Sequence, residues 1–340
     1  MTATVNTVTI STDEVTELLT STWPGVAVGA VRPLSGGFWA TMFRVQVTGQ
    51  PDAVADEVVV RIAPHRSMGA KEVEVQRSVA AQGVPTPPVW LSCPDEGRGG
   101  WWSVMGFSRG QPLLAGLDGL AALRRAPSLL RTLPAQLARS MAAVHRVDPA
   151  PVTAAVRSVA PEVAWSTTDV LEHLRLGAET AGRDDVRVAL DQLGRHAPAT
   201  VPEVVCHGDL HPFNVLDDDG QLVVLDWTGA VVADPCFDLA LTELLLANPP
   251  LVLPGPLAAV GRRAGRLLAR RFITAYTRAN PGVSLDALSW FRALHSARVV
   301  IECTNHRAQH SPDGGGHPFA LVEPAAVGHL NAATGIEIQR

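Results

Sequence analysis

Several residue types are scarce in this chain, and each scarcity excludes a class of protein. Of 340 residues one is a lysine, Lys71, and one is a tyrosine, Tyr276, so that 27 of the 28 basic residues are arginines. The four cysteines lie far apart and form no CxxC pair, so we expect reduced thiols and a cytoplasmic location. No Lys or Arg precedes Arg32, which predicts that a secretory signal with a basic start is absent.

Long apolar runs and an excess of one charge are also lacking. The most apolar region, residues 239–260, is interrupted by Glu243, Asn248 and four prolines, so we expect no membrane span and no membrane partner. The net charge is −5 with arginines and acidic residues interspersed, which argues against a nucleic-acid partner. A hydrophobic content of 46% is enough for a large core, and the length predicts two domains or lobes. We expect a monomer or a homodimer.

The residues that carry chemistry begin just after residue 203. Residues 204–206 form a short apolar run that predicts a strand, and this strand leads into the polar segment His-Gly-Asp-Leu-His-Pro-Phe-Asn at 207–214. The segment combines histidines, one acidic residue and one amide over eight positions. Such a loop, delivered by a buried strand, is typical of a catalytic site.

A predicted hairpin follows this polar segment. Residues 214–216 and 221–225 are the two expected strands, because the Asp-Asp-Asp-Gly sequence between them is typical of a tight turn. The hairpin would bring Asn214 and Asp226 toward the same open end, beside Asp209.

The spacing of these residues resembles the catalytic segment of protein kinases. Phosphoryl transfer needs an acceptor hydroxyl oriented by a carboxylate and Mg²⁺ held by oxygen ligands. Asp209 suits the first task, and Asn214 with Asp226 suits the second. With His-Gly-Asp at 207–209 and Asp-Trp-Thr-Gly at 226–229, the chain resembles the aminoglycoside phosphotransferase and choline kinase family.

The resemblance extends over about residues 30–305, and the stretch Asp-Pro-Cys-Phe-Asp-Leu-Ala at 234–240 matches the next motif of the family. In that motif the second aspartate, here Asp238, braces the catalytic loop. The resemblance implies an α+β, bilobal protein-kinase-like fold, with a small β-rich N-terminal lobe holding one main helix and a larger, mostly helical C-terminal lobe. It also implies ATP and Mg²⁺ as cofactors and Asp209 as the catalytic acid–base residue.

Two histidines flank Asp209 and leave a second interpretation open. We expect a structural role for His207, with its ring hydrogen-bonded to backbone, and His211 is expected to orient the loop or to contact the acceptor. A metallohydrolase could instead use His207, Asp209 and His211 as zinc ligands, although Asn214 and Asp226 would then have no role. A protein kinase is disfavoured, because no Ala-Pro-Glu sequence follows Asp226 at activation-loop distance.

The first hundred residues predict a small sheet with a phosphate-covering loop. Strands are expected over 26–34, 41–47 and 57–62, from their β-rich composition and partial alternation. Between the first two lies a glycine turn, whose backbone N–H groups could approach phosphate because glycine admits positive φ. Its family resemblance assigns nucleotide binding to three residues: Ser35, Gly36 and Gly37.

The third strand ends in Arg61, at the position where protein kinases carry a phosphate-binding lysine. A guanidinium can bind two phosphate oxygens, but it is not equivalent to an ammonium group. A helix is expected over 71–82, in which Glu72 would pair with Arg61, with Glu74 as the fallback, while Lys71 is expected to face solvent. If Arg61 could not support catalysis, the chain would be a pseudokinase-like nucleotide-binding regulator.

The hinge between the lobes is expected after a fifth strand. Met105 and Phe107 fall in a segment that resembles the adenine-binding hinge, where recognition uses main-chain atoms. The predicted division is an N-terminal nucleotide-binding lobe over 1–104, a hinge over 105–112 and a C-terminal catalytic and substrate-binding lobe over 113–340.

The acceptor is expected to be a hydroxyl of a small molecule: an antibiotic, a sugar or another natural product. Aminoglycosides need clustered carboxylates, and choline needs aromatic cages, which an aromatic content of 5% and a single tyrosine make less favourable. Possible substrate contacts are His211, Glu243 and Glu302. Other acidic candidates in the large lobe are Glu162, Asp169 and Glu172.

Overall fold

The computed structural model describes residues 11–34, 40–114, 119–199, 201–249, 256–309 and 317–339, with backbone only at 119–126, 256–258 and 318. The chain divides into two compact units. The first comprises Met1–Gln111, Ala150–Val163 and Leu216–Thr228, and the second comprises Pro112–Pro149, Ala164–Val215 and Gly229–Arg340.

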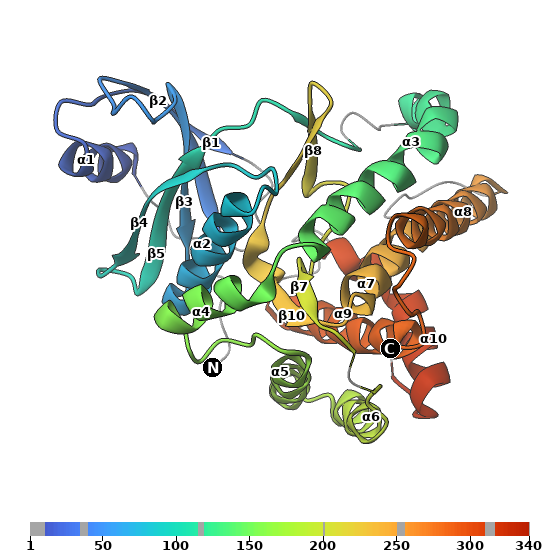
Figure 1. Cartoon of the computed structure of the whole chain (residues 1–340). Coiled ribbons are helices and arrows are strands. Elements are labelled where there is room, and N and C mark those ends of the chain that lie inside the picture. The colour runs from blue at the N-terminus through green and yellow to red at the C-terminus, as the bar shows by residue number, and fades with distance from the viewer. Residues whose placement is uncertain are drawn as a thin grey trace. The chain divides into compact units, whose positions relative to one another are not determined.

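A five-stranded antiparallel sheet forms the centre of the first unit (Figure 1). The middle strand, β3 (Glu57–Ala63), is buried along nearly its whole length, which fits its valine- and isoleucine-rich sequence. In the order of pairing, the strands are β1 (Ala27–Leu34), β2 (Thr41–Thr48), β3 (Glu57–Ala63), β5 (Gly100–Gly106) and β4 (Val89–Asp95).

Helices of the first unit pack on this sheet. The helix α2 (Arg66–Ala81) contacts β3, β4 and β5, and Figure 1 shows it lying along the sheet. The helix α1 (Thr12–Thr22) begins with a capping box in which Ser11 and Glu14 exchange hydrogen bonds, and it buries Val15 and Leu19. A third helix, α4 (Pro149–Val159), belongs to the same unit for most of its length.

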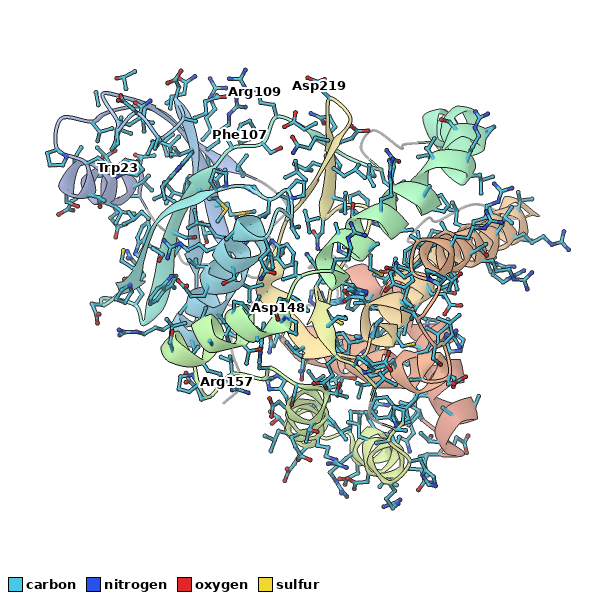
Figure 2. All side chains as sticks on the ribbon, in the orientation of Figure 1. Trp23, Phe107, Arg109, Asp148, Arg157 and Asp219 are labelled. Atoms are coloured by element: carbon cyan, nitrogen blue, oxygen red, sulfur yellow. The ribbon has the colours of Figure 1, made fainter. Side chains whose placement is uncertain are left out.

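A hairpin from later in the sequence also packs into the first unit. Its strands β8 (Val215–Asp218) and β9 (Gln221–Val224) form a three-stranded sheet with β6 (Gln111–Pro112). Asp219 and Gly220 turn the chain with φ angles of 51° and 91°, and Figure 2 shows Asp219 at the tip. The hairpin expected from the Asp-Asp-Asp-Gly sequence is present, and it leads into the 3₁₀ turn η1 (Trp227–Gly229).

The second unit is mostly helical. Its small sheet pairs β7 (Val204–Cys206) with β10 (Val231–Ala233), and its core includes Phe237, Phe291 and Leu294. Its helical elements are α3 (Gly119–His145), α5 (Thr167–Thr180), α6 (Asp184–Arg195), α7 (Cys236–Ala247), α8 (Pro256–Ala279), α9 (Leu288–Gln309), η2 (Pro318–Leu321) and α10 (Glu323–Thr334). Across the described ranges, no helix combines the length and the apolarity needed to cross a bilayer.

Candidate active site

A buried ion pair joins the sheet and the main helix of the first unit. Arg61 on β3 and Glu72 on α2 lie with Nη2 and Oε2 3.0 Å apart, and Arg61 Nε donates to the same oxygen at 3.2 Å. Both side chains are buried. Glu74, the fallback partner, pairs instead with Arg77 at 3.0 Å on the more exposed side of α2. The strand therefore places its cation against a glutamate of the main helix, and the expected pairing of Arg61 with Glu72 is present.

Arg61 also contacts the segment after the hairpin. Its Nη2 donates to Thr228 Oγ1 at 3.2 Å and lies 3.6 Å from Asp226 Oδ1. Thr228 Oγ1 in turn donates to Asp226 Oδ1 at 2.6 Å, and Asp226 adopts a φ of 61°, which is uncommon for a residue with a side chain. Burial disfavours the charge on Arg61, but Glu72 and Asp226 outweigh burial and raise the pKa of the guanidinium. The cation is thus held next to two carboxylates.

Lys71 does not face solvent, so that prediction was wrong. The side chain is 3% exposed on α2, and its Nζ donates to the backbone oxygen of Thr228 at 3.5 Å. Burial lowers the pKa of Lys71 to about 8; Glu72 opposes this shift, and Arg157 adds to it. Helix α2 has buried residues on several sides, and residues 150–163 and 216–228 belong to the same compact unit as this helix.

The catalytic loop of the second unit depends on two glycines. Gly208 has a φ of 75°, and a Cβ atom there would lie 1.9 Å from the backbone oxygen of Gly229. Only glycine fits this approach, so the motif requires the Gly between His207 and Asp209 on steric grounds. His207 is buried, and its Nδ1 accepts the backbone N–H of Asp209 at 3.2 Å. This is the ring-to-backbone contact expected for His207.

Asp238 holds the same loop from α7. Its Oδ2 accepts the N–H of His207 and its Oδ1 accepts the N–H of Gly208, both at 2.7 Å. His145 Nε2 lies 3.0 Å from Asp238 Oδ2, and His145 Nδ1 lies 2.6 Å from the hydroxyl of Tyr276. Burial alone would raise the pKa of Asp238, but His145 and the backbone donors outweigh it and keep that pKa low. The loop backbone is therefore anchored to a buried carboxylate.

The same cluster has the composition of a metal site, but its hydrogen bonds argue otherwise. Among the described residues, His145, Cys206 and Asp238 are the one group whose potential ligand atoms all lie within 4.8 Å of each other. Both oxygens of Asp238 already accept hydrogen bonds, and burial keeps the pKa of the Cys206 thiol well above its usual range. A zinc site needs thiolate and unengaged nitrogen or oxygen donors. The three ligands expected for a metallohydrolase, His207, Asp209 and His211, do not form such a group in the part of the chain that the structure describes.

Asp209 presents one oxygen to no protein donor. Its Oδ1 is buried and accepts no hydrogen bond from the described residues, whereas Oδ2 lies 3.7 Å from His211 Nε2. Asn214 Nδ2 donates to the backbone oxygen of Asp209 at 2.9 Å. The amide nitrogen of Asn214 is therefore engaged with the loop, which leaves its carbonyl oxygen as the atom suited to a cation.

An arginine that the sequence did not single out also contacts the loop. Arg298 on α9 donates from Nη1 to the backbone oxygen of Gly208 at 3.0 Å. Glu302, one helical turn further on, accepts from Arg298 Nε at 2.7 Å, and His317 Nε2 lies 3.8 Å from the other Glu302 oxygen. The i, i+4 spacing of an arginine and a glutamate was the available signal. Sequence alone could not show that Nη1 of this arginine reaches the backbone oxygen of residue 208.

The acidic residues considered for acceptor binding all have partners inside the chain. Glu243 forms an ion pair with Arg292, and Glu302 with Arg298. Contact of Glu243, Glu302 or His211 with an acceptor stays a prediction. Of the other three candidates, Glu162 bonds to Ser67, Asp169 caps α5 and Glu172 pairs with Arg175.

The glycine turn and the hinge are the two other segments that were predicted to bind the nucleotide. Ser35, Gly36 and Gly37 lie outside the described residues. Met105 is on β5, paired with Val59 of β3, and Phe107 follows that strand with the Arg44 guanidinium 4.0 Å from its ring centroid. Figure 2 labels Phe107 on the segment leaving the sheet. Their hinge role, like the boundaries predicted at 104 and 112, stays a prediction.

Solved structures share this architecture over nearly the whole chain. A candidate aminoglycoside phosphotransferase from Ralstonia eutropha JMP134 is 17% identical with a TM-score of 0.65, covering 96% of this chain and 99% of that chain. A thermostable variant of aminoglycoside phosphotransferase APH(4)-Ia, in a complex with ADP and hygromycin B, is 17% identical with a TM-score of 0.61, covering 95% and 98%. Amicoumacin kinase hAmiN, in complex with AMP-PNP, Ca²⁺ and Ami, is 13% identical with a TM-score of 0.61, covering 97% and 96%.

These likenesses define the class of fold, that of the protein-kinase-like phosphotransferases. The sequence model of the phosphotransferase enzyme family matches residues 30–279, and the chain belongs to this family. The predicted family, fold class and enzyme class are thereby confirmed.

Proposed function

We propose that the chain transfers the γ-phosphoryl group of ATP to a hydroxyl group of a small molecule, with Mg²⁺ as the metal. The observation that carries the proposal is Asp209 Oδ1, a buried oxygen with no donor among the described residues, on a loop that Asp238 holds through two backbone N–H groups. A carboxylate in this state is suited to accept the proton of an acceptor hydroxyl. Membership of the family supports the reaction class.

Each remaining role is assigned residue by residue. Arg61, kept charged and oriented by Glu72, binds phosphate oxygens of the nucleotide. Asn214 and Asp226 would supply oxygen ligands to Mg²⁺, and the bound ion would provide positive charge beside the phosphates. Asp238 and His207 keep the loop in its conformation.

Ligands bound to related proteins support the proposal that this chain uses ATP and a small-molecule acceptor. The related structure of APH(4)-Ia is a complex with ADP and hygromycin B, and that of hAmiN is a complex with AMP-PNP, Ca²⁺ and Ami. ATP with a divalent cation, and a natural-product hydroxyl, are accordingly what we propose for this chain. Antibiotic resistance would be one consequence of such an activity, and a cytoplasmic location fits its supply of ATP.

ADP release tests the function. We would incubate the protein with ATP and Mg²⁺ over a panel of antibiotics, sugars and nucleosides, and compare wild type with Asp209→Asn. The variant should keep its ATP-dependent thermal shift and lose about 10²–10⁴-fold in turnover, the usual scale of general-base help. Asp184→Asn makes the same chemical change at an exposed carboxylate on α6 and should behave as wild type.

Three outcomes would contradict the proposal. Equal turnover in Asp209→Asn would remove the assigned base. ATP binding without turnover across the panel would favour the regulator, the alternative without catalysis. Restoration of activity by zinc without ATP would favour the metallohydrolase.

A further inference from the structure

Two packed helices of the second unit carry exposed arginines that have no carboxylate partner among the described residues. Helices α3 and α8 pack against each other, and Arg271 Nη1 on α8 donates to the backbone oxygen of Leu130 on α3 at 2.8 Å. Neither helix contains an Asp or a Glu. Eight of their arginines are exposed and form no ion pair with any described residue: Arg131, Arg139, Arg262, Arg263, Arg266, Arg270, Arg271 and Arg278.

Most of the other described arginines of the second unit have carboxylate partners. On α5, α6 and α9, and between α5 and α6, six of them lie within ion-pair distance of carboxylates. These six are Arg175, Arg183, Arg187, Arg292, Arg298 and Arg307. The arginine-rich composition of the chain does not by itself explain why the arginines of α3 and α8 lack carboxylate partners, because most other arginines of the second unit have them.

Two apolar side chains lie among the unpaired arginines of α8. Val260 and Leu267 are 57% and 41% exposed, and their spacing of seven residues places them on one line of the helix, roughly 10 Å apart. At 100° per residue, Arg263 and Arg270 fall on one side of this line and Arg271 on the other. The opposite side of α8 is anchored in the unit by Phe272 and Tyr276, which are fully buried. Figure 2 shows nitrogen-tipped side chains projecting from this helix.

We propose that the exposed face of α8, together with the adjoining arginines of α3, docks onto an anionic phospholipid surface. Each guanidinium would meet a lipid phosphate or carboxylate, and the methylene stems of the arginines would lie against the boundary of the acyl chains. Val260 and Leu267 would enter that boundary as shallow apolar contacts. This is contact with a membrane surface, and it departs from the expectation, drawn from the sequence, of no membrane partner.

The apolar pair is what favours lipid over nucleic acid. Nucleic acids attract arginines equally well, but proteins that bind single strands add aromatic stacking platforms. The described exposed residues of α8 include no aromatic side chain. Exposed valine and leucine at the centre of an arginine face have no counterpart on a phosphate backbone, whereas a bilayer supplies both an anionic layer and an apolar one.

Sedimentation with vesicles tests the docking surface independently of any acceptor. The full-length chain would be mixed with sucrose-loaded vesicles of phosphatidylcholine alone or with added phosphatidylserine. We expect binding to the anionic vesicles only, and weaker binding as salt is raised. Arg263→Gln with Arg270→Gln should weaken this binding about fivefold for each arginine removed. Val260→Ser with Leu267→Ser should weaken it about tenfold.

A matched control removes two arginines from α6. Arg187→Gln with Arg195→Gln makes the same change in net charge within the same unit and should bind anionic vesicles like wild type. Thermal melting of each variant confirms that the surface changes leave the fold intact. Equal binding to both kinds of vesicle, or equal loss in the α6 control, would overturn the proposal.

A second measurement separates the competing partners. Fluorescence anisotropy with a labelled DNA duplex should show no tighter binding than to the anionic vesicles. If the chain binds DNA but not vesicles, or if the Val260 and Leu267 variant binds phosphatidylserine vesicles as wild type does, the face is a polyanion site and the lipid assignment fails.

Discussion

Arg298 holds the peptide group of Gly208 by its oxygen, at 3.0 Å, while Asp238 holds the peptide N–H of the same residue at 2.7 Å. Two charged side chains from different helices, α9 and α7, thus fix the residue that directly precedes Asp209. A loop held at the two peptide groups on either side of one residue has little freedom to rotate. The position of the proposed base therefore depends on residues that do not contact a substrate themselves.

Replacing Arg298 tests this dependence. Arg298→Met should lower turnover about tenfold, since a hydrogen bond from a charged group is lost, and should leave the ATP-dependent thermal shift unchanged. Arg298→Lys should recover part of the rate because it keeps the charge without the fork. Arg307→Met removes another arginine of α9 and serves as the control. Wild-type turnover in Arg298→Met would show that Asp238 alone positions the loop.

The ion pair between Arg61 and Glu72 predicts non-additive effects on nucleotide use. Arg61→Ala should raise the ATP Michaelis constant and lower turnover, and Glu72→Ala should add little in that background, a coupling of about 0.5–3 kcal/mol. The pair formed by Glu74 and Arg77 on the same helix provides the control cycle, with no effect on ATP. Full ATP affinity in Arg61→Ala would assign the phosphate-binding role to another residue.

Lys71 predicts a pH dependence of stability. The pKa of Lys71 is about 8 in the folded chain, against 10.5 for an ordinary exposed lysine. Between pH 8 and 10.5 the unfolded chain therefore binds more protons than the folded one. Stability attributable to Lys71 should therefore rise as pH increases from about 8 to 10.5, by about 3 kcal/mol in total. Chemical denaturation of wild type and Lys71→Met across this range isolates the effect as a difference. Parallel curves would show that Lys71 titrates normally.

Two glycines with positive φ, Gly220 and Gly208, allow the stability cost of backbone strain to be separated from the cost of a steric clash. Gly220→Ala at the hairpin turn meets no atom within 4 Å and should cost about 1–2 kcal/mol from the backbone angle alone. Gly208→Ala carries the same strain and also a collision with Gly229 O, so it should cost about 1–3 kcal/mol more and abolish turnover. Equal melting temperatures for the two variants would mean that the loop can move away from residue 229.

The sequence predicted local structure better than it predicted long-range contacts. The strands expected over 26–34, 41–47 and 57–62 and the hairpin at 214–225 follow from composition and spacing, which local physics decides. The pairing of Arg61 with Glu72 needed the family resemblance, because a strand and a helix must first pack. Helix α1 was not predicted, although Ser11 and Glu14 have the spacing of a capping box.

Side-chain environments set by distant segments could not be predicted. Thr228 lies 167 positions from Arg61, and Arg298 lies 90 positions from Gly208, so no local pattern signals either contact. Lys71 was expected to face solvent, but residues 150–163 and 216–228 join the first unit and Lys71 Nζ donates to the backbone oxygen of Thr228.

The burial of Lys71 gives this protein an internal reporter of its own motions. Apart from the chain terminus, it is the one amine in 340 residues, and it is 3% exposed. An acylating reagent can modify it only when the first unit opens locally, so the labelling rate measures that opening at a single known position. Mass spectrometry of one peptide would then follow the opening of the first unit without any engineered probe.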